Sequence, residues 1–191
     1  MPGEFAPVDA IDALVRRGVR FVIVGGFAGQ LLGSSSLTRD LDVCYDRDEE
    51  NLRRLAAALR DLHASLRGAP RDVPFVLDAA RLQAGDRFTF ETDVGALDIL
   101  GHPTGIPGGY EELERAAEEV DIGRSRVKVA SIDDLIRMKR AAGRPKDLVE
   151  VEVLGALRDE IDERAMADRR RRRRPQGRGS DDQVEQAAVS N

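Results

Sequence analysis

The sequence predicts an α/β fold, in which a small mixed sheet is backed by helices and followed by a helical C-terminal portion. Three segments lead to this prediction. Residues 21–24 form a continuous apolar run that stops at a glycine pair, as expected of a buried central strand. Residues 41–45 alternate, and residues 48–66 then place leucines along one face, which indicates a strand followed by a long helix. From residue 146 to about residue 166, apolar side chains recur at helical spacing, which indicates a final helix.

The remaining elements follow from similar patterns and from turn residues. Ser131, with Asp134 three residues later, begins one helix, and Gly143 ends it. Residues 87–92 and 96–100 flank a short turn and predict a hairpin whose second strand carries Asp98. Residues 68–85 are irregular, apart from one or two helical turns over 77–82. The other predicted elements are helices over residues 8–17, 27–32 and 110–119 and a strand over residues 125–129.

Length and composition favour one domain with an appendage. The 191 residues are 41% hydrophobic, which is enough for one sizeable core, and we assign residues 1–166 to this domain. Residues 167–191 contain an arginine run and then Pro, Gly, Ser, Gln and acidic residues, so we expect a disordered, arginine-rich tail. The arginine run either steers RNA by long-range attraction or is simply a solvated tail.

Several classes of protein are disfavoured. The formal net charge is −5, and because the end of the chain is basic, the body is more acidic still, which argues against non-specific DNA coating. The single cysteine, Cys44, has no partner for an intramolecular disulfide, so we expect a reduced, cytoplasmic location. The N-terminus lacks a secretion signal, and no apolar run is long enough to span a membrane. We therefore expect no membrane partner.

The clearest chemical pattern is formed by Asp40, Asp42 and Asp98. Residues i and i+2 of a strand point to the same face, so Asp40 and Asp42 present two carboxylates side by side. Asp98 lies between apolar residues and adds a third carboxylate from a neighbouring strand. Clustered carboxylates repel one another unless a cation lies between them. Oxygen-only ligands suit Mg²⁺ or Mn²⁺, and two such ions activate an attacking hydroxyl and stabilise a departing pyrophosphate.

The glycine pair Gly25-Gly26, separated from Asp40 by thirteen residues, predicts a phosphate site beside this metal site. Glycine lets the backbone approach a triphosphate closely, and the helix expected next points free N–H groups at it. Ser34 and Thr38 supply hydroxyl donors on the way to the strand that carries Asp40.

Together these residues resemble the signature of the polymerase-beta-like nucleotidyltransferase superfamily. That signature begins with an apolar residue followed by Gly and then by Gly or Ser. After a gap of about this length come an Asp-apolar-Asp motif and, later, a lone Asp on a strand. The resemblance spans roughly residues 21–157. It implies the nucleotidyltransferase fold, an NTP such as ATP as substrate, and Mg²⁺ or Mn²⁺ as cofactor. It also implies that Asp40 and Asp42 hold both metal ions, while Asp98 completes one ion's ligands and assists deprotonation of the acceptor.

Residues 131–147 further resemble the C-terminal helices of the AbiEii-like branch, which includes toxins of toxin–antitoxin pairs. In that branch a lysine on the first of these helices, here Lys139, contacts the nucleotide phosphates. Arg144 and Asp147 match the Arg-x-x-Asp that lines the same cleft. Many relatives carry a second Asp three residues after Asp147, where this sequence has Glu150. The charge is kept, but the side chain is longer.

Each of these residues also has a purely structural explanation. Glycine pairs and Asp-x-Asp strands are common in α/β proteins, and Asp98 is compatible with an edge-strand charge that discourages aggregation. Lys139, Arg144 and Asp147 lie near helix ends, where their charges complement the helix dipoles. Outside the motif, we interpret His102 as a loop residue without a specific role and Cys44 as a packing residue. The functional interpretation of the motif is favoured because all its parts occur together at the family spacing.

The predicted reaction transfers a nucleoside monophosphate from an NTP to a hydroxyl acceptor and releases pyrophosphate. By resemblance, the first candidate acceptor is the end of a tRNA, which would make the protein a toxin with a cognate antitoxin as partner. Two alternatives stay open. In the first, the enzyme transfers the nucleotide to a small molecule, as in antibiotic adenylylation, or to a protein side chain. In the second, the protein is a catalytically silent module that binds NTP and metal without turnover.

Overall fold

The structure is a computed structural model that describes residues 4–69 and 76–173. The chain divides into two compact units, of which the first ends at Arg158 and the second begins at Asp159. Every predicted site residue belongs to the first unit. Within the second unit, the described residues are helical, and Arg164 pairs with Glu160 one turn away on the exposed surface.

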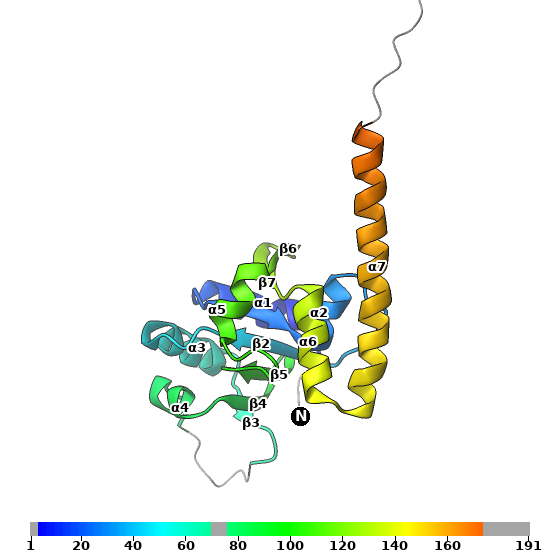
Figure 1. Cartoon of the computed structure of the whole chain (residues 1–191). Helices are drawn as coiled ribbons and strands as arrows, with labels where there is room; N and C mark the ends of the chain where they lie inside the picture. Colours follow the sequence, from blue (N-terminus) through cyan, green and yellow to red (C-terminus); the bar gives the residue numbers. More distant parts are fainter. Residues whose placement is uncertain (1–3, 70–75, 174–191) are drawn as a thin grey trace, which may run out of the picture. The chain divides into compact units, whose positions relative to one another are not determined.

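Within the described residues, seven strands form one mixed sheet, which confirms the predicted fold class (Figure 1). The sheet order is β3-β4-β5-β2-β1-β7-β6. Strand β2 runs parallel to β5, and β1 runs parallel to β7, whereas the other neighbours are antiparallel. The strands are β1 (Phe21–Val24), β2 (Asp40–Tyr45), β3 (Ser65–Leu66), β4 (Arg87–Thr92), β5 (Gly95–Leu100), β6 (Glu118–Ile122) and β7 (Ser125–Val129).

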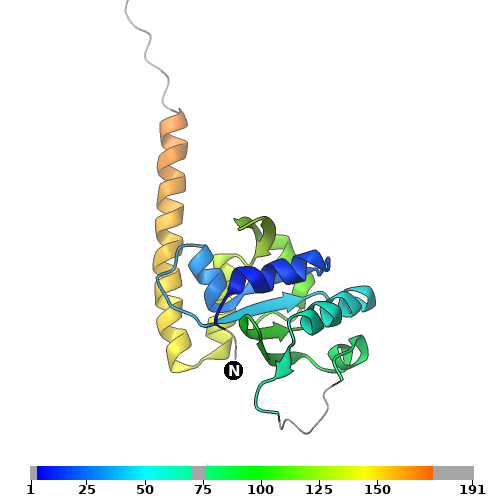
Figure 2. The same cartoon turned by 180° about the vertical axis from the view of Figure 1, so that it is seen from behind.

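Helices cover both faces of the sheet in the first unit. Figure 1 shows α5 and α6 in front of the sheet, and Figure 2, seen from behind, shows α1 and α3 in front of the opposite face. All four strand residues of β1 are buried, as expected of a central strand covered on both sides. The helices are α1 (Pro7–Arg16), α2 (Gly25–Leu31), α3 (Glu49–Asp61), α4 (Ala79–Ala84), α5 (Gly109–Ala116), α6 (Ile132–Ala142) and α7 (Pro145–Arg173).

Two helices are shorter than predicted, because a strand follows each of them. The helix predicted over residues 48–66 ends at Asp61, and the left-handed backbone of His63, with φ of 49°, turns the chain so that Ser65 pairs with β4. The helix predicted over residues 110–119 ends at Ala116, where Ala117 adopts an extended conformation that leads into β6. Strand β6 is an edge strand rich in acidic residues, so it lacks the apolar alternation that identifies a strand.

Two helix boundaries differ in the other direction. Helix α2 includes the glycine pair and does not begin after it. Helix α7 continues past Met166 to Arg173, so residues 167–173 of the tail that we expected to be disordered are helical. The sequence after Gly155 contains no Gly or Pro until Pro175 and is rich in Arg and Ala, which are strong helix formers. The rest of the predicted tail, residues 174–191, lies outside the described residues.

No described helix combines the length and the apolar content that a membrane span requires.

Asn51 on α3 fixes this helix to the strands that carry the site. Its side chain is fully buried, accepts a hydrogen bond from Arg20 N (2.7 Å) and donates to Arg20 O (3.1 Å) and Asp46 O (2.7 Å). Asn51→Ala leaves these backbone groups without partners, so we expect it to lower the free energy of unfolding by about 2–3 kcal/mol in urea titrations. The exposed neighbour Glu50→Ala serves as control, and a loss below about 1 kcal/mol for Asn51→Ala would contradict this assignment.

Candidate active site

The three predicted carboxylates lie on adjacent strands. Asp42 on β2 is the lateral partner of Asp98 on β5, and Asp40 lies two residues before Asp42. Laterally paired residues of neighbouring strands point to the same face, and strands are spaced about 4.8 Å apart. The fold therefore brings Asp40, Asp42 and Asp98 to one face of the sheet, as the sequence pattern predicted.

Asp98 is a buried carboxylate with incomplete pairing. The residue is 5% exposed, and its Oδ1 accepts no hydrogen bond from the described residues. Arg87 places Nη2 3.5 Å from Asp98 Oδ2, and Arg67 places Nη2 4.0 Å from Asp98 Oδ1. A buried acceptor without a donor is costly, and such atoms mark positions where a ligand or ion completes the bonding.

Asp42 is destabilised as an anion by its surroundings. Burial, followed by the charges of Asp40 and Asp98, raises the pKa of Asp42 from its ordinary value of 3.8 to about 7. The positive charges of Lys139 and Arg87 act in the opposite direction but do not cancel the rise. The site therefore concentrates negative charge that calls for a cation.

The donor set fits a hard divalent cation such as Mg²⁺ or Mn²⁺. Three carboxylates share one face, and Oδ1 of Asp98, which accepts no hydrogen bond from the described residues, is available as a ligand. As they stand, however, no three Asp, Glu, His or Cys side chains among the described residues are close enough together to hold a metal ion. The contacts of Asp40 and Asp98 explain this spacing: Thr38 Oγ1 donates to Asp40 Oδ1 at 2.5 Å, and Arg87 holds Asp98. Metal binding therefore requires these side chains to turn.

The glycine pair lies directly against the carboxylates. Gly25 has φ of +69°, and a Cβ atom at this position would lie 2.1 Å from Asp42 Oδ2. A Cβ on Gly26 would lie 2.9 Å from Thr38 Cβ. Position 25 therefore requires glycine for two reasons: other residues rarely adopt this backbone conformation, and a side chain here would overlap Asp42. Thr38, predicted as a phosphate donor, lies against Gly26 and donates a hydrogen bond to Asp40.

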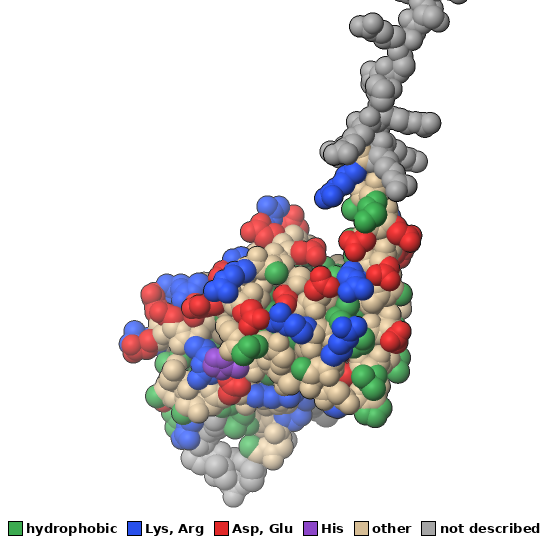
Figure 3. All heavy atoms as spheres, viewed as in Figure 1, with side chains coloured by type: hydrophobic (Ala, Val, Ile, Leu, Met, Phe, Trp, Pro, Cys, Tyr) green, Lys and Arg blue, Asp and Glu red, His purple; other side chains and the backbone are tan. Residues whose placement is uncertain are grey.

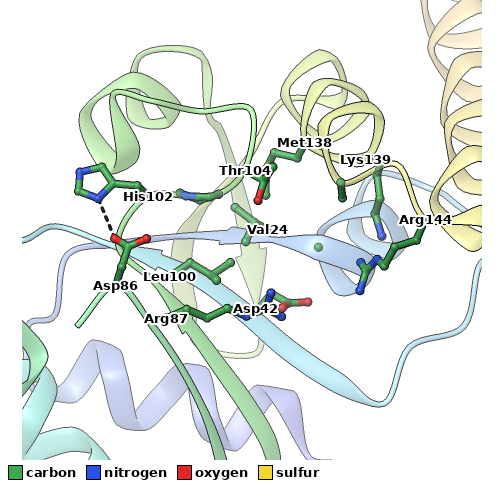
Figure 4. A pocket seen from close by; sticks show the side chains of 13 residues that line it. Val24, Asp42, Asp86, Arg87, Leu100, His102, Thr104, Met138, Lys139 and Arg144 are labelled. Atoms are coloured by element: carbon green, nitrogen blue, oxygen red, sulfur yellow. Dashed lines mark hydrogen bonds and ion pairs between the residues drawn. The ribbon is translucent and has the colours of Figure 1, made fainter.

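A cleft of about 210 Å³ opens beside Asp42 (Figure 4). Figure 4 shows Asp42 and Arg87 at the sheet, Lys139 and Arg144 at one end of the cleft, and His102 with Asp86 at the other end. Asp40 and Asp98 are not among the residues that line it. The apolar part of the lining consists of Val24, Leu100, Pro103, Met138 and Ala142.

Lys139 and Arg144 reach the cleft but are already paired with acidic residues. Asp147 is fully buried and binds Arg144 through Nε (2.6 Å) and Nη2 (3.1 Å), which keeps the pKa of Asp147 below its ordinary range. Lys139 Nζ contacts Glu150 Oε2 and lies 3.7 Å from Asp147 Oδ1. Asp147, predicted as a nucleotide contact, is thus placed to position the two cations. Glu150 contacts Lys139 despite its longer side chain.

A second, smaller hollow adjoins the first at Gly25 and Lys139. It is also lined by Gly26, Ser34 and Glu150. Ser34 Oγ accepts a hydrogen bond from Ser36 N at 3.2 Å, so its hydroxyl proton is free to point elsewhere. The residues predicted to bind the nucleotide, except Thr38 and Asp147, therefore line one or both of these two hollows.

Arg87 and His102 are site residues that the sequence interpretation did not assign. Thr89 is the cross-strand partner of Asp98, and Arg87 lies two residues before Thr89 on the same strand. Both residues therefore point to the face of Asp98, which the hairpin register could have shown from the sequence. His102 lines the cleft, and its Nδ1 lies 2.7 Å from Asp86 Oδ1. Cys44 is fully buried, and burial raises the pKa of its thiol to about 12, in agreement with a packing role.

No protein-family profile and no curated protein sequence matches the chain. Solved structures do match. The lincomycin-bound lincosamide antibiotic adenylyltransferase LnuA superposes with a TM-score of 0.55 over 81% of this chain and 99% of that chain, at 12% sequence identity. The chain has the nucleotidyltransferase fold. The antibiotic-resistance factor ANT(2'')-Ia aligns with a TM-score of 0.47 and 16% identity over 87% of this chain and 96% of that chain.

Proposed function

We propose that the protein transfers a nucleoside monophosphate from an NTP to a hydroxyl acceptor. The acceptor oxygen attacks the α-phosphorus, a new P–O bond forms, and the bond from the α-phosphorus to the bridging oxygen breaks. Pyrophosphate leaves with the electron pair of that bond, and the acceptor proton passes to a carboxylate, which we assign to Asp98. Mg²⁺ or Mn²⁺ bound by Asp40, Asp42 and Asp98 would supply positive charge to the phosphates and the acceptor oxygen.

One observation carries this proposal: the position of Gly25 against Asp42, with Asp98 in register beside it. A carboxylate whose pKa is raised by burial and by two like charges needs a cation, and the absence of a side chain at Gly25 lets this carboxylate pack directly against the backbone of the glycine pair. Lys139 and Arg144 lie at the end of the cleft where the triphosphate would lie, and we assign to them the neutralisation of its charge.

The acceptor that we propose first is the end of a tRNA. In that case the protein would stop translation by modifying tRNA, as a toxin of the AbiEii-like branch controlled by a cognate antitoxin. This assignment rests on the similarity of residues 131–147 to that branch.

A small-molecule acceptor is the second candidate, supported by three observations. Between its two charged ends the cleft is lined in part by the apolar residues Leu100, Pro103 and Met138, which suits a compact organic molecule. On the face shown in Figure 3, basic and acidic side chains are interspersed, whereas a long RNA contact needs a concentration of basic groups. LnuA, which shares the fold, has lincomycin bound.

One assay separates these candidates. The full chain is incubated with Mg²⁺, each α-³²P-labelled NTP, and either total tRNA or a panel of lincosamides and aminoglycosides. We expect label in one acceptor class with the wild type and none with the Asp40→Ala, Asp42→Ala double variant. Label in the protein itself would identify a protein acceptor. NTP binding without transfer to any acceptor or release of pyrophosphate would support the catalytically silent module and contradict the proposed reaction.

A further inference from the structure

The cation proposed to bind the triphosphate is held by carboxylates in the structure. Lys139 Nζ contacts Glu150 Oε2 and lies 3.7 Å from Asp147 Oδ1, and the lysine side chain is only 15% exposed. A lysine paired in this way presents little net positive charge to an incoming anion. At least one of the two carboxylates must therefore move before Lys139 can neutralise a phosphate group.

The two carboxylates differ in their freedom to move. Asp147 is fully buried and is fixed by three hydrogen bonds from Arg144, two from the guanidinium and one from the backbone N–H at 3.2 Å. Releasing it would leave a buried charge unpaired, which is costly. The Glu150 side chain is 27% exposed, and it has the longer and more flexible chain. Glu150 can therefore rotate into water, whereas Asp147 stays in place.

Glu150 also forms part of the wall of the hollow that we propose for a phosphate group. The hollow between Gly25, Gly26, Ser34 and Lys139 has a cavity volume of only about 10 Å³, and Glu150 forms part of its wall. A cavity of this size holds about one water molecule. A phosphate group that occupied this hollow would have to displace part of its wall, and Glu150 is the wall residue whose charge the phosphate would replace.

We propose that Glu150 is a displaceable carboxylate that occupies the phosphate position beside Lys139 until the triphosphate of the nucleotide displaces it. This inference rests on the proposed function and adds a positioning residue to it. Glu150 acts through Lys139: it keeps the lysine oriented toward the hollow and competes with bound phosphate. After transfer, its return to Lys139 favours the departure of pyrophosphate. Glu150 thus lowers the affinity for both substrate and product.

The test measures binding of inorganic pyrophosphate with Mg²⁺ to the full chain by isothermal titration calorimetry. Glu150→Gln removes the competing charge and keeps the shape, so we expect the dissociation constant to fall by about tenfold. Glu152→Gln removes the same charge from an exposed position two residues along α7, and we expect a change of less than about twofold. In a Lys139→Ala background, the effect of Glu150→Gln should disappear, which a merely structural role of Glu150 would not produce.

Two outcomes overturn the inference. If the wild type binds pyrophosphate and Glu150→Gln leaves the dissociation constant unchanged or raises it, Glu150 does not compete with phosphate, and the proposed reaction still stands. If the wild type binds neither pyrophosphate nor an NTP in the presence of Mg²⁺, the proposed function itself fails and the inference fails with it.

Discussion

Asp42→Asn is expected to abolish nucleotide transfer and, at the same time, to stabilise the protein in EDTA. The wild-type carboxylate is buried beside Asp40 and Asp98, which raises its pKa to about 7. Removing its charge relieves this repulsion, and we expect a gain of roughly 1–3 kcal/mol in the free energy of unfolding at pH 8. Transfer should fall by at least about a hundredfold to a thousandfold, because the lost charge belongs to a proposed metal ligand.

The pH dependence gives this prediction a control. A carboxylate with a raised pKa destabilises the folded protein at each pH where it is ionised. The resulting loss in the free energy of unfolding is therefore absent near pH 4 and fully present above about pH 7. Melting temperatures of Asp42→Asn and wild type in EDTA should therefore coincide near pH 4 and diverge toward pH 8. A variant that is less stable than wild type at pH 8 would show that Asp42 is not under electrostatic strain.

Gly25→Ala is expected to have the second-largest effect. A side chain at φ of +69° is strained, and the new Cβ would overlap Asp42 Oδ2, which would lie 2.1 Å away, so Asp42 must turn out of its position. The backbone strain alone costs about 1–2 kcal/mol, and we expect transfer to fall by roughly a hundredfold because the displaced residue is a proposed metal ligand. Circular dichroism melting and the transfer assay measure the two effects.

Gly155 provides a matched control on α7. A Cβ at Gly155 meets no atom within 4 Å, and helix-interior Gly→Ala changes favour the helix by about 0.5–1 kcal/mol. Gly155→Ala should keep full activity and melt at the same or a slightly higher temperature. If Gly25→Ala behaved like Gly155→Ala, the close packing of Gly25 on Asp42 would not be a requirement of the reaction.

Much of the fold could be predicted because its elements have strong local signals. The apolar run of β1 and the Ser131 and Gly143 ends of α6 are local features, and the structure has them where they were predicted. Strand β6 was missed although its partner β7 follows it directly in a hairpin, because its acidic residues lack the apolar alternation of a strand and imitate a helix surface. The end of the helix before Ser65 was missed because it depends on pairing with β4, which lies more than twenty residues further along the chain.

The site could be predicted in part. Alternation within β2 placed Asp40 and Asp42 on one face, but the register with Asp98 comes from a parallel pairing between strands far apart in the sequence. Residue type alone does not distinguish ligands from supports, because hydroxyl and carboxylate groups act equally well as either. The structure adds the present partners of two predicted nucleotide contacts: Thr38 binds Asp40, and Asp147 binds Arg144.

The most direct test of the central claim is a crystal structure of the full chain with Mn²⁺ and an NTP analogue that cannot be cleaved between the α- and β-phosphates. We predict anomalous density for Mn²⁺ between Asp40, Asp42 and Asp98, and the triphosphate between Gly25 and Lys139. A nucleotide bound elsewhere, or ordered nucleotide without Mn²⁺ at these carboxylates, would contradict the account.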